Sequence, residues 1–479
     1  MSVDYDLIIL GATPAGIQAA IAATTLKARV ALITQGITST AAPELVSHHA
    51  LLQVAHTKKQ TQFPGPFQVA PAPPDQWHQV APWLEAVVMN VEATRVTGLA
   101  YQGVDVLDGR GQFCRKPGLR VQAGDRTLQA RGYLLTMDEQ PTIPPISGLE
   151  TITYSTPATF PSKIATLAPA AQVAILGSGK TAVELAQALS YLGFQTTLLT
   201  QQACLLPEAD RDVSQAIQAQ LEADGVVVRL QTLIHQIQAK GGQSQIHLDA
   251  EILVVDEVVL ATGQAPNGAA LNLTAAGVRW SSHGIVVSRK QQTTQPRIYA
   301  CEGRWGGECF AHLATAEATI ALKNILFLPG FKVKVQSLPL AIHTSPAVAW
   351  VGLTEAQAIR RHGRKNVFIL QQAFHTVPKA HMRNDLNGFC KLVVHRNGTL
   401  LGAHLVGEQG SELINVLALA MQHKLKVGAI AALPCPTSTL AEILKHTAAT
   451  YSNLYLKQNN LLQDFIDHCF DLRRALSKS

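Results

Sequence analysis

The stretch DLIILGATPAGIQAAIAATTLKARVALIT, residues 6–34, decides how this chain begins to fold. It contains an apolar strand, a turn at Gly11-Ala-Thr-Pro-Ala-Gly16, an Ala-rich helix and a second apolar strand at Val30 to Ile33. This order is typical of the βαβ unit that opens a dinucleotide-binding domain. A glycine permits the tight turn, backbone N–H groups at the helix start face a pyrophosphate, and Gly16 allows close packing of helix and strand. We predict that this turn contacts a dinucleotide through Gly11, Thr13, Pro14, Ala15 and Gly16.

Two positions of this unit depart from the usual pattern. Thr13 occupies the place of the middle glycine, which normally lets the backbone approach the phosphates. Thr34, followed by Gln35, stands where an Asp or Glu usually binds the ribose hydroxyls. We include Thr13, Thr34 and Gln35 in the predicted cofactor site. Because Thr13 and Thr34 differ from the usual pattern, the main question is whether the site still binds its cofactor.

A second copy of the motif begins 166 residues later, at Val173-Ala-Ile-Leu-Gly177-Ser-Gly179-Lys-Thr-Ala182-Val-Glu184. Its GxGxxA form is a permitted variant, and two such units in one chain are a stronger signal than one. The strand after it ends in Thr200-Gln201-Gln202, with neither the acid that indicates NAD nor the arginine that indicates NADP. The preference between NADH and NADPH stays open. The predicted nucleotide-contacting residues of this unit are Gly177, Gly179, Ala182, Glu184 and, in the closing strand and turn, Gly263.

Length and composition set the frame around these two units. A chain of 479 residues is too long for one core, so two to four domains are expected. Its 47% hydrophobic and 15% charged residues are typical of a soluble globular protein. Without a run of eighteen apolar residues we expect no membrane span, and a strand so near Met1 leaves no room for a signal peptide, so we expect a cytoplasmic protein.

Charge and cysteine usage narrow the class further. The net charge of +6 is spread along the chain, which does not indicate a nucleic-acid partner. The seven cysteines include no CxxC pair and indicate scattered reduced thiols. They lie at positions 114, 204, 301, 309, 390, 435 and 469.

The pattern changes after Pro329. Short apolar strands joined by Gly and Asn turns are followed by two helices, which indicates an independent α+β domain. From Leu461 onward, apolar residues at 461, 462, 465, 466, 469 and 470 form a helical stripe. We expect it to dock onto the body or onto a partner subunit, with membrane-surface binding as the weaker alternative.

The order of parts resembles the pyridine nucleotide-disulfide oxidoreductases, the family of dihydrolipoamide dehydrogenase, glutathione reductase and mercuric reductase. Matching segments include 141–148, 261–263, 298–300, 311–317, 344–355, 388–392 and 401–407. The resemblance implies an α/β fold with two Rossmann-like dinucleotide-binding domains, for FAD and NAD(P), plus a C-terminal α+β dimerisation domain. The implied boundaries are 1–155 with 265–333 for FAD, 156–264 for NAD(P), 334–455 for dimerisation and 456–479 for a helical tail. It also implies FAD as cofactor, NADH or NADPH as substrate, a homodimer through the C-terminal domain, and a place for Glu184 beside the nicotinamide.

The residues that such proteins use for chemistry are altered in this chain. The family's CxxxxC disulfide follows the second strand, but residues 38–56 contain no cysteine. Disulfide exchange needs a thiolate, so that reaction has no chemical means here. The family's HPTxxE motif reads Cys435-Pro-Thr-Ser-Thr-Leu-Ala-Glu442, with a thiol in place of the imidazole and a changed spacing. Glu302 and Gly303 occupy the Gly-Asp positions that bind the FAD ribityl chain in the family.

Two hypotheses follow from this mixture. In the first, NAD(P)H reduces FAD, and the flavin passes electrons directly to a small acceptor such as a quinone, dye, oxygen or metal, which needs no cysteine. In the second, the chain is a pseudoenzyme that has lost FAD, with or without the loss of NAD(P), and acts as a dimeric scaffold for an unknown protein partner. We favour the flavoprotein. We do not expect a working disulfide or mercuric reductase, because Cys301 and Cys309 have the wrong spacing for the family's cysteine pair.

Overall fold

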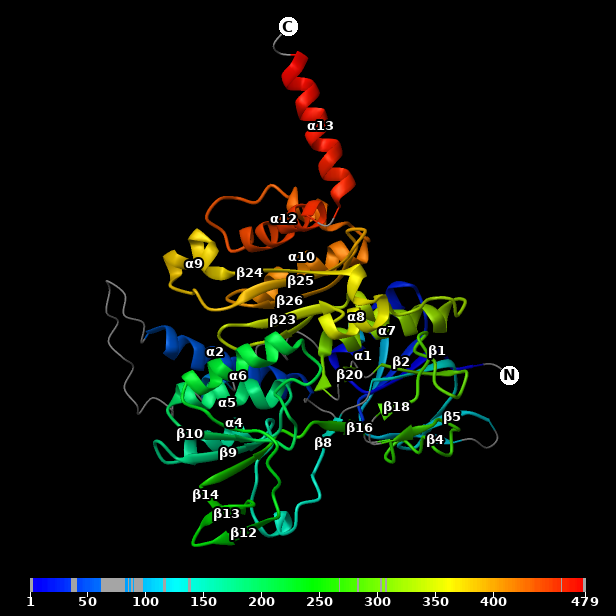
Figure 1. The fold of residues 1–479 in the computed structure, drawn as a ribbon. Coiled ribbons are helices and arrows are strands. Elements are labelled where there is room, and N and C mark those ends of the chain that lie inside the picture. The colour runs from blue at the N-terminus through cyan, green and yellow to red at the C-terminus, as the bar shows by residue number, and fades with distance from the viewer. Residues whose placement is uncertain are drawn as a thin grey trace. The chain divides into compact units, whose positions relative to one another are not determined.

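The computed structural model describes residues 3–35, 41–61, 82–84, 86–87, 89, 98–114, 118–136, 139–266, 268–281, 284–301, 304–305, 308–457 and 459–476. The chain divides into two compact units (Figure 1). The first contains Met1–Pro207 with Gln220–Val333, and the second contains Glu208–Ala219 with Lys334–Ser479.

The first sheet of the first unit grows from the opening βαβ stretch. Its five strands are parallel and lie in the order β19-β7-β1-β2-β3. They are β1 (Tyr5–Leu10), β2 (Val30–Ile33), β3 (Val104–Leu107), β7 (Ala130–Leu135) and β19 (Ile298–Ala300). The predicted strand at Val30 to Ile33 is thus confirmed residue for residue.

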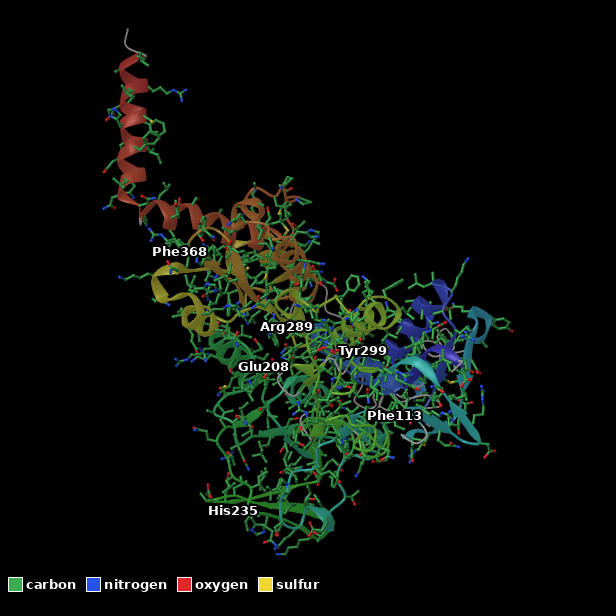
Figure 2. The ribbon with its side chains drawn as sticks, turned by 90° about the vertical axis from the view of Figure 1, so that its right-hand side faces the viewer. Phe113, Glu208, His235, Arg289, Tyr299 and Phe368 are labelled. Carbon is green, nitrogen blue, oxygen red and sulfur yellow. The ribbon has the colours of Figure 1, made fainter. Side chains whose placement is uncertain are left out.

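Both faces of this sheet are covered, which explains why its strands are continuous apolar runs. On one face, small residues of α1 (Pro14–Thr25) pack with α7 (Ala311–Leu326). The other face packs against an antiparallel meander. Phe113 of this meander, labelled in Figure 2, lies edge-on to Tyr133 of β7, with the two ring centroids 5.5 Å apart. The meander strands are β4 (Gly111–Cys114), β5 (Arg120–Ala123) and β6 (Arg126–Leu128).

A second parallel sheet follows the second glycine motif. Its order is β11-β10-β9-β15, formed by β9 (Gln172–Leu176), β10 (Gln195–Leu199), β11 (Val227–Arg229) and β15 (Glu257–Leu260). Helix α5 (Lys180–Leu192) leaves the motif, and nearly every residue in it is buried. A three-stranded antiparallel sheet covers part of this core through β12 (Gln236–Lys240), β13 (Gln243–His247) and β14 (Ile252–Val255).

Helix α2 (Ala41–Thr61) packs along α5. Its end is held at the carboxylate of Asp224, which is 2% exposed and forms an ion pair with Lys59 at 3.0 Å. Gln187 and Tyr191 of α5 each donate a hydrogen bond of 2.8 Å to the same carboxylate. This group, the Asp224 cluster, ties the last turn of α2 to the second sheet's main helix.

The second unit is built on an antiparallel sheet in the order β22-β23-β26-β25-β24. The strands are β22 (Leu340–Ile342), β23 (Val348–Gly352), β24 (Val367–Ala373), β25 (Phe389–His395) and β26 (Leu400–Val406). The helices that follow bury their apolar faces on it, and Phe368, marked in Figure 2, contacts Tyr451 with ring centroids 5.8 Å apart. These helices are α8 (Glu355–His362), α10 (Gly410–Gln422) and α12 (Glu442–Lys457), whereas the last helix, α13 (Asn460–Leu476), follows α12 with its large apolar side chains exposed.

A buried ion network lies inside the second unit. The ammonium group of Lys391, 1% exposed, contacts Asp210 at 2.7 Å, Asp212 at 2.8 Å and Glu355 at 2.9 Å. Three carboxylates around one desolvated ammonium raise the pKa of Lys391, although burial alone would lower it. His404, fully buried beside them, hydrogen-bonds through Nε2 to the carbonyl oxygen of Leu353 at 3.1 Å.

Shorter elements complete the described structure. They are α4 (Phe160–Lys163), α6 (Arg211–Ala223), α9 (Pro378–Arg383), α11 (Val427–Ala431), β8 (Glu139–Pro141), β16 (Gln264–Pro266), β17 (Trp280–Ser281), β18 (Gly284–Ile285), β20 (Arg304–Trp305) and β21 (Glu308–Cys309). Among the residues described, no helix combines the length and apolar character needed to span a bilayer.

Candidate functional site

The first glycine turn keeps the geometry that its sequence predicts. Gly11 has φ +118°, and a Cβ there would overlap the carbonyl oxygen of Thr136. A Cβ at Gly16 would likewise overlap the carbonyl oxygen of Gly11. Both positions therefore require glycine, for backbone conformation at Gly11 and for close approach at Gly16.

Thr13 takes the place of the middle glycine without strain. Its φ of −67° and ψ of 162° are extended values that any residue adopts. Its hydroxyl accepts a hydrogen bond from the N–H of Gly16 at 3.3 Å, which makes Thr13 the N-cap of α1. Pro14 begins the helix, where its missing N–H costs nothing, and Ala15 is buried. Thr13 thus preserves the turn and the helix start, which is where a pyrophosphate would bind in this motif.

The ribose end of this site is different. The buried Thr34 hydroxyl accepts a hydrogen bond from the N–H of Gly109 at 3.2 Å. The Gln35 amide pairs with the backbone of Gly111 twice, once as acceptor and once as donor, each at 3.2 Å. These contacts hold the connection between β3 and β4. The described residues that directly follow β2, Thr34 and Gln35, include no carboxylate, and the Thr34 hydroxyl proton is a polar donor that this position offers a ribose.

Two predicted flavin contacts, Glu302 and Gly303, lie outside the described residues. The turn at Gly263 is described: it has φ +95°, and its carbonyl oxygen accepts a hydrogen bond from the N–H of Thr142 at 2.9 Å. Next to it, the Thr262 hydroxyl donates to the carbonyl oxygen of Thr142 at 2.6 Å. Gly263 therefore joins β16 to β8, the antiparallel pair formed by the two segments that cross between the sheets.

The second glycine turn repeats the packing of the first. Gly177 has φ +151°, and a Cβ there would overlap the carbonyl oxygen of Ala261 and touch Ala182. Gly179 is the N-cap of α5, and Ala182 is fully buried in the first turn of that helix. A small residue at the last position of GxGxxA is what this close contact between turn and helix requires.

A buried group of charged side chains gathers where α2 meets α5. His48 Nε2 lies 2.9 Å from Glu184 Oε2, and both side chains are buried, with 8% and 0% exposed. Lys180 Nζ lies 3.9 Å from the same oxygen, with its side chain 9% exposed. The Lys180 ammonium also lies 5.3 Å from the ring centroid of Phe310. We call His48, Glu184 and Lys180 the buried triad.

The sequence analysis selected only Glu184 of this triad. No sequence motif points to His48, because the family pattern specifies only cysteines in the helix after β2. The signal was available, since His48-His49 interrupts an otherwise apolar stretch in the helix after β2. Lys180 was missed because a lysine in the first turn of a helix is usually solvated, whereas here it is buried.

The triad has the chemistry of a proton-holding site. A carboxylate acceptor at 2.9 Å keeps a proton on His48 Nε2, and Lys180 adds a positive charge that stabilises the carboxylate. His48 Nδ1 is buried and has no hydrogen-bond partner among the described residues. A buried imidazole with one satisfied and one open nitrogen is suited to exchange a proton with a bound molecule.

The other predicted acid-base positions lie in the second unit. The Cys435 thiol is half-buried, 3.9 Å from the carbonyl oxygen of Ala441 at the start of α12. Glu442 follows as the first residue of α12, and its Oε2 atom is buried without a hydrogen-bond partner in the described structure. Cys435 and Glu442 are seven residues apart in sequence, and the segment between them contains no histidine.

Comparisons with known proteins agree with this architecture. The family model described as pyridine nucleotide-disulphide oxidoreductase matches residues 5–318, and that of its dimerisation domain matches residues 338–448. A mercuric reductase from Staphylococcus aureus is 28% identical over 460 residues, covering 94% of this chain and 82% of the relative. One from Acidithiobacillus ferrooxidans is 30% identical over 411 residues, covering 83% and 73%.

A solved structure has the same fold. The HOCl-induced flavoprotein disulfide reductase RclA from Escherichia coli superimposes with a TM-score of 0.79 at 24% identity, covering 93% of this chain and 99% of its own. This likeness concerns the fold. It agrees with two parallel sheets followed by an antiparallel C-terminal unit.

Proposed function

The chain belongs to the pyridine nucleotide-disulphide oxidoreductase family, and from that premise we propose that it oxidises NAD(P)H through FAD and reduces a small acceptor without disulfide chemistry. Members of the family bind FAD and use NAD(P)H as substrate. We infer a quinone as the type of acceptor, because it takes two electrons and protons without needing a protein thiol.

The observation that carries this proposal is the buried triad on α2 and α5. The helix after β2 holds His48 bonded to Glu184, whereas residues 38–56 contain no cysteine. No two cysteines of the whole sequence have the CxxxxC spacing. An imidazole with an open nitrogen supports proton transfer at this place in the fold, and a thiol-disulfide step has no residues to perform it.

Each part of the first unit has a role in this proposal. The turn from Gly11 to Gly16 and the start of α1 would hold the pyrophosphate of FAD, and Thr34 would offer its hydroxyl to the ribose. The turn from Gly177 to Ala182 would hold NAD(P)H. When bound, FAD supplies the capacity to take two electrons from NAD(P)H and release them to the acceptor.

The proposed reaction consumes one proton, and we assign the delivery of this proton to His48. Reduction of a quinone consumes NAD(P)H, one quinone and one proton, and yields NAD(P)+ and the hydroquinone. The Nε2–H of His48 stays bonded to the Glu184 carboxylate, with the Lys180 ammonium beside it, while the open Nδ1 takes up a proton from solvent. The Nδ1 proton then passes to the reduced quinone oxygen, and solvent replaces it.

Spectroscopy of the purified protein tests the proposal. We expect bound flavin in the visible spectrum, bleaching when NADH or NADPH is added anaerobically, and recovery of the colour when a quinone is added. Oxidised glutathione or lipoamide should give no recovery, because no redox disulfide passes the electrons on. A colourless protein that also fails to take up added FAD would refute the enzyme.

One observation favours a second candidate function, a dimeric scaffold without FAD. The side chains of Thr34 and Gln35 are bound to Gly109 and Gly111, where a ribose would otherwise find a carboxylate. A charge-assisted hydrogen bond lost at this position weakens binding by roughly 1.5–3 kcal/mol. Bleaching of a bound flavin by either nucleotide would rule the scaffold reading out.

We also propose a homodimer formed through residues 335–455, because the dimerisation-domain model matches residues 338–448. Sedimentation of the full chain at micromolar concentration should give twice the mass of one chain. A monomer would contradict the proposed dimer without bearing on the flavin chemistry of the first unit.

A further inference from the structure

The last helix, α13 (Asn460–Leu476), presents a row of large apolar side chains to solvent. It extends from α12, away from the antiparallel sheet of its unit, and appears red in Figure 1. Five of its apolar side chains are between 51% and 82% exposed. They are Leu461, Phe465, Phe470, Leu472 and Leu476. Exposed apolar surface of this kind is typical of an interaction site.

The spacing of these residues indicates the kind of partner. Phe465, Cys469, Leu472 and Leu476 follow one another at intervals of four, three and four residues. This is the spacing of the a and d positions in a coiled coil, where one helix inserts side chains between those of another. The face of α13 therefore fits a second amphipathic helix.

We propose that α13 pairs with α13 of a second copy of this chain. The helix directly follows α12, whose first part lies in the segment that matches the family's dimerisation domain. A two-fold axis through a homodimer brings the same element of each copy together, and a self-complementary heptad face is what such an axis requires. The pairing would extend the dimer interface beyond residue 455.

Charge argues against a membrane as the partner of this helix. Between residues 460 and 476 there are three aspartates, at 464, 467 and 471, and two arginines, at 473 and 474. Helices that lie on anionic membranes carry a basic polar face instead. Interhelical packing needs no such excess of positive charge.

Attachment to the dimerisation domain makes the pairing feasible. A helix of 17 residues is too short to form a stable coiled coil by itself. Two copies held close by a common interface meet at a high effective concentration, so a weak helix-helix contact is populated in the dimer.

Cys469 is a built-in reporter of this pairing. It is exposed, lies on the apolar face and stands one residue from the middle of α13. In a parallel or an antiparallel pair, the two copies of Cys469 therefore come close together. A short bifunctional maleimide should join two full-length chains through this residue, giving a band of doubled mass that Cys469→Ser loses.

Substitutions on the two faces of the helix complete the test. Leu472→Asp should lose the cross-link while the protein still sediments as a dimer, because residues 335–455 are unchanged. Asp464→Asn, on the polar face, should keep the cross-link. The proposal is wrong if the wild-type dimer gives no cross-link, if Leu472→Asp cross-links like the wild type, or if anionic phospholipid vesicles bind the protein through Leu472. A monomeric wild type would overturn the homodimer as well.

Discussion

At the scale of single residues, His48 offers a sharp test of the proposed chemistry. His48→Gln keeps a donor toward Glu184 but removes the group that exchanges a proton, so we expect quinone turnover to fall roughly 100-fold. Bleaching of the flavin by NAD(P)H should proceed at the wild-type rate, because that half-reaction needs no proton from His48. Stopped-flow spectroscopy measures the two half-reactions separately.

The matched control is His235→Gln. His235, labelled in Figure 2, is a half-exposed histidine that also contacts a carboxylate, that of Asp249. This variant should leave both half-reactions unchanged. If His48→Gln slowed both half-reactions equally, or left the pH profile of quinone turnover unaltered, His48 would be a structural residue.

The buried ammonium group of Lys391 leads to a prediction about the stability of the protein against urea. In Lys391→Met the ammonium is gone, and the buried Asp210 carboxylate loses its principal cation. Removing one partner from a buried ion pair costs about 3–5 kcal/mol. The urea midpoint should therefore drop strongly relative to the exposed-site control Lys365→Met. Equal midpoints in the two variants would show that the network contributes nothing.

At the scale of elements, the glycine turn before α1 depends on one backbone conformation. In Gly11→Ala, the alanine would have to adopt a φ of +118°, which disfavours any side chain. Its Cβ would also overlap the carbonyl oxygen of Thr136. We expect a loss of about 1–3 kcal/mol of stability, together with a lower flavin content per chain. Gly428→Ala in α11 is the control, because a Cβ there meets no atom within 4 Å. Calorimetry and the visible spectrum measure the two effects, and a Gly11→Ala protein with normal values for both would contradict this account.

Elements with a strong local pattern could be predicted from the sequence. The apolar runs at β1, β2 and β9, the glycine turns after them and the stripe of α13 are set by neighbouring residues, so periodicity and turn chemistry identify them. The buried triad could not be predicted, because its members come from α2 and α5, 136 residues apart for His48 and Glu184. The capping role of Thr13 and the backbone contacts of Gln35 were also hidden, because a substituted motif does not say what the new side chain binds.

At the scale of the whole molecule, the ionisable groups of the Lys391 network contribute to the pH dependence of unfolding. Burial would raise the pKa of Asp210 and Glu355, but His404 and Lys391 near Asp210, and Lys391 and Arg364 near Glu355, outweigh it and hold both pKa values below the usual range. Their stabilisation is present above the unfolded pKa and is lost as pH falls through the folded one. Burial lowers the pKa of His404, so the stability that depends on its neutral imidazole is also lost on acidification, below about pH 6.5. Because the pKa of Lys391 is raised, the stability that its ammonium contributes is lost only at alkaline pH, above about pH 10.

We therefore expect the urea midpoint to be level between about pH 6.5 and 10, and to fall at more acidic pH. Lys391→Met should weaken the acid dependence, because Asp210 and Glu355 lose the cation that lowers their pKa. Urea unfolding at a series of pH values measures this. A midpoint that rises on acidification below pH 6 would contradict the assignment.

The Asp224 cluster has a consequence for the far end of the helix it holds. Lys59 and His48 stand eleven residues apart on α2, about 16 Å along a stiff rod. A small rotation about the Asp224 anchor is therefore magnified into a larger sideways displacement of the imidazole. Since hydrogen-bond strength falls steeply with distance and angle, we expect the alignment of His48 with Glu184 to depend on the carboxylate that anchors the other end of the helix.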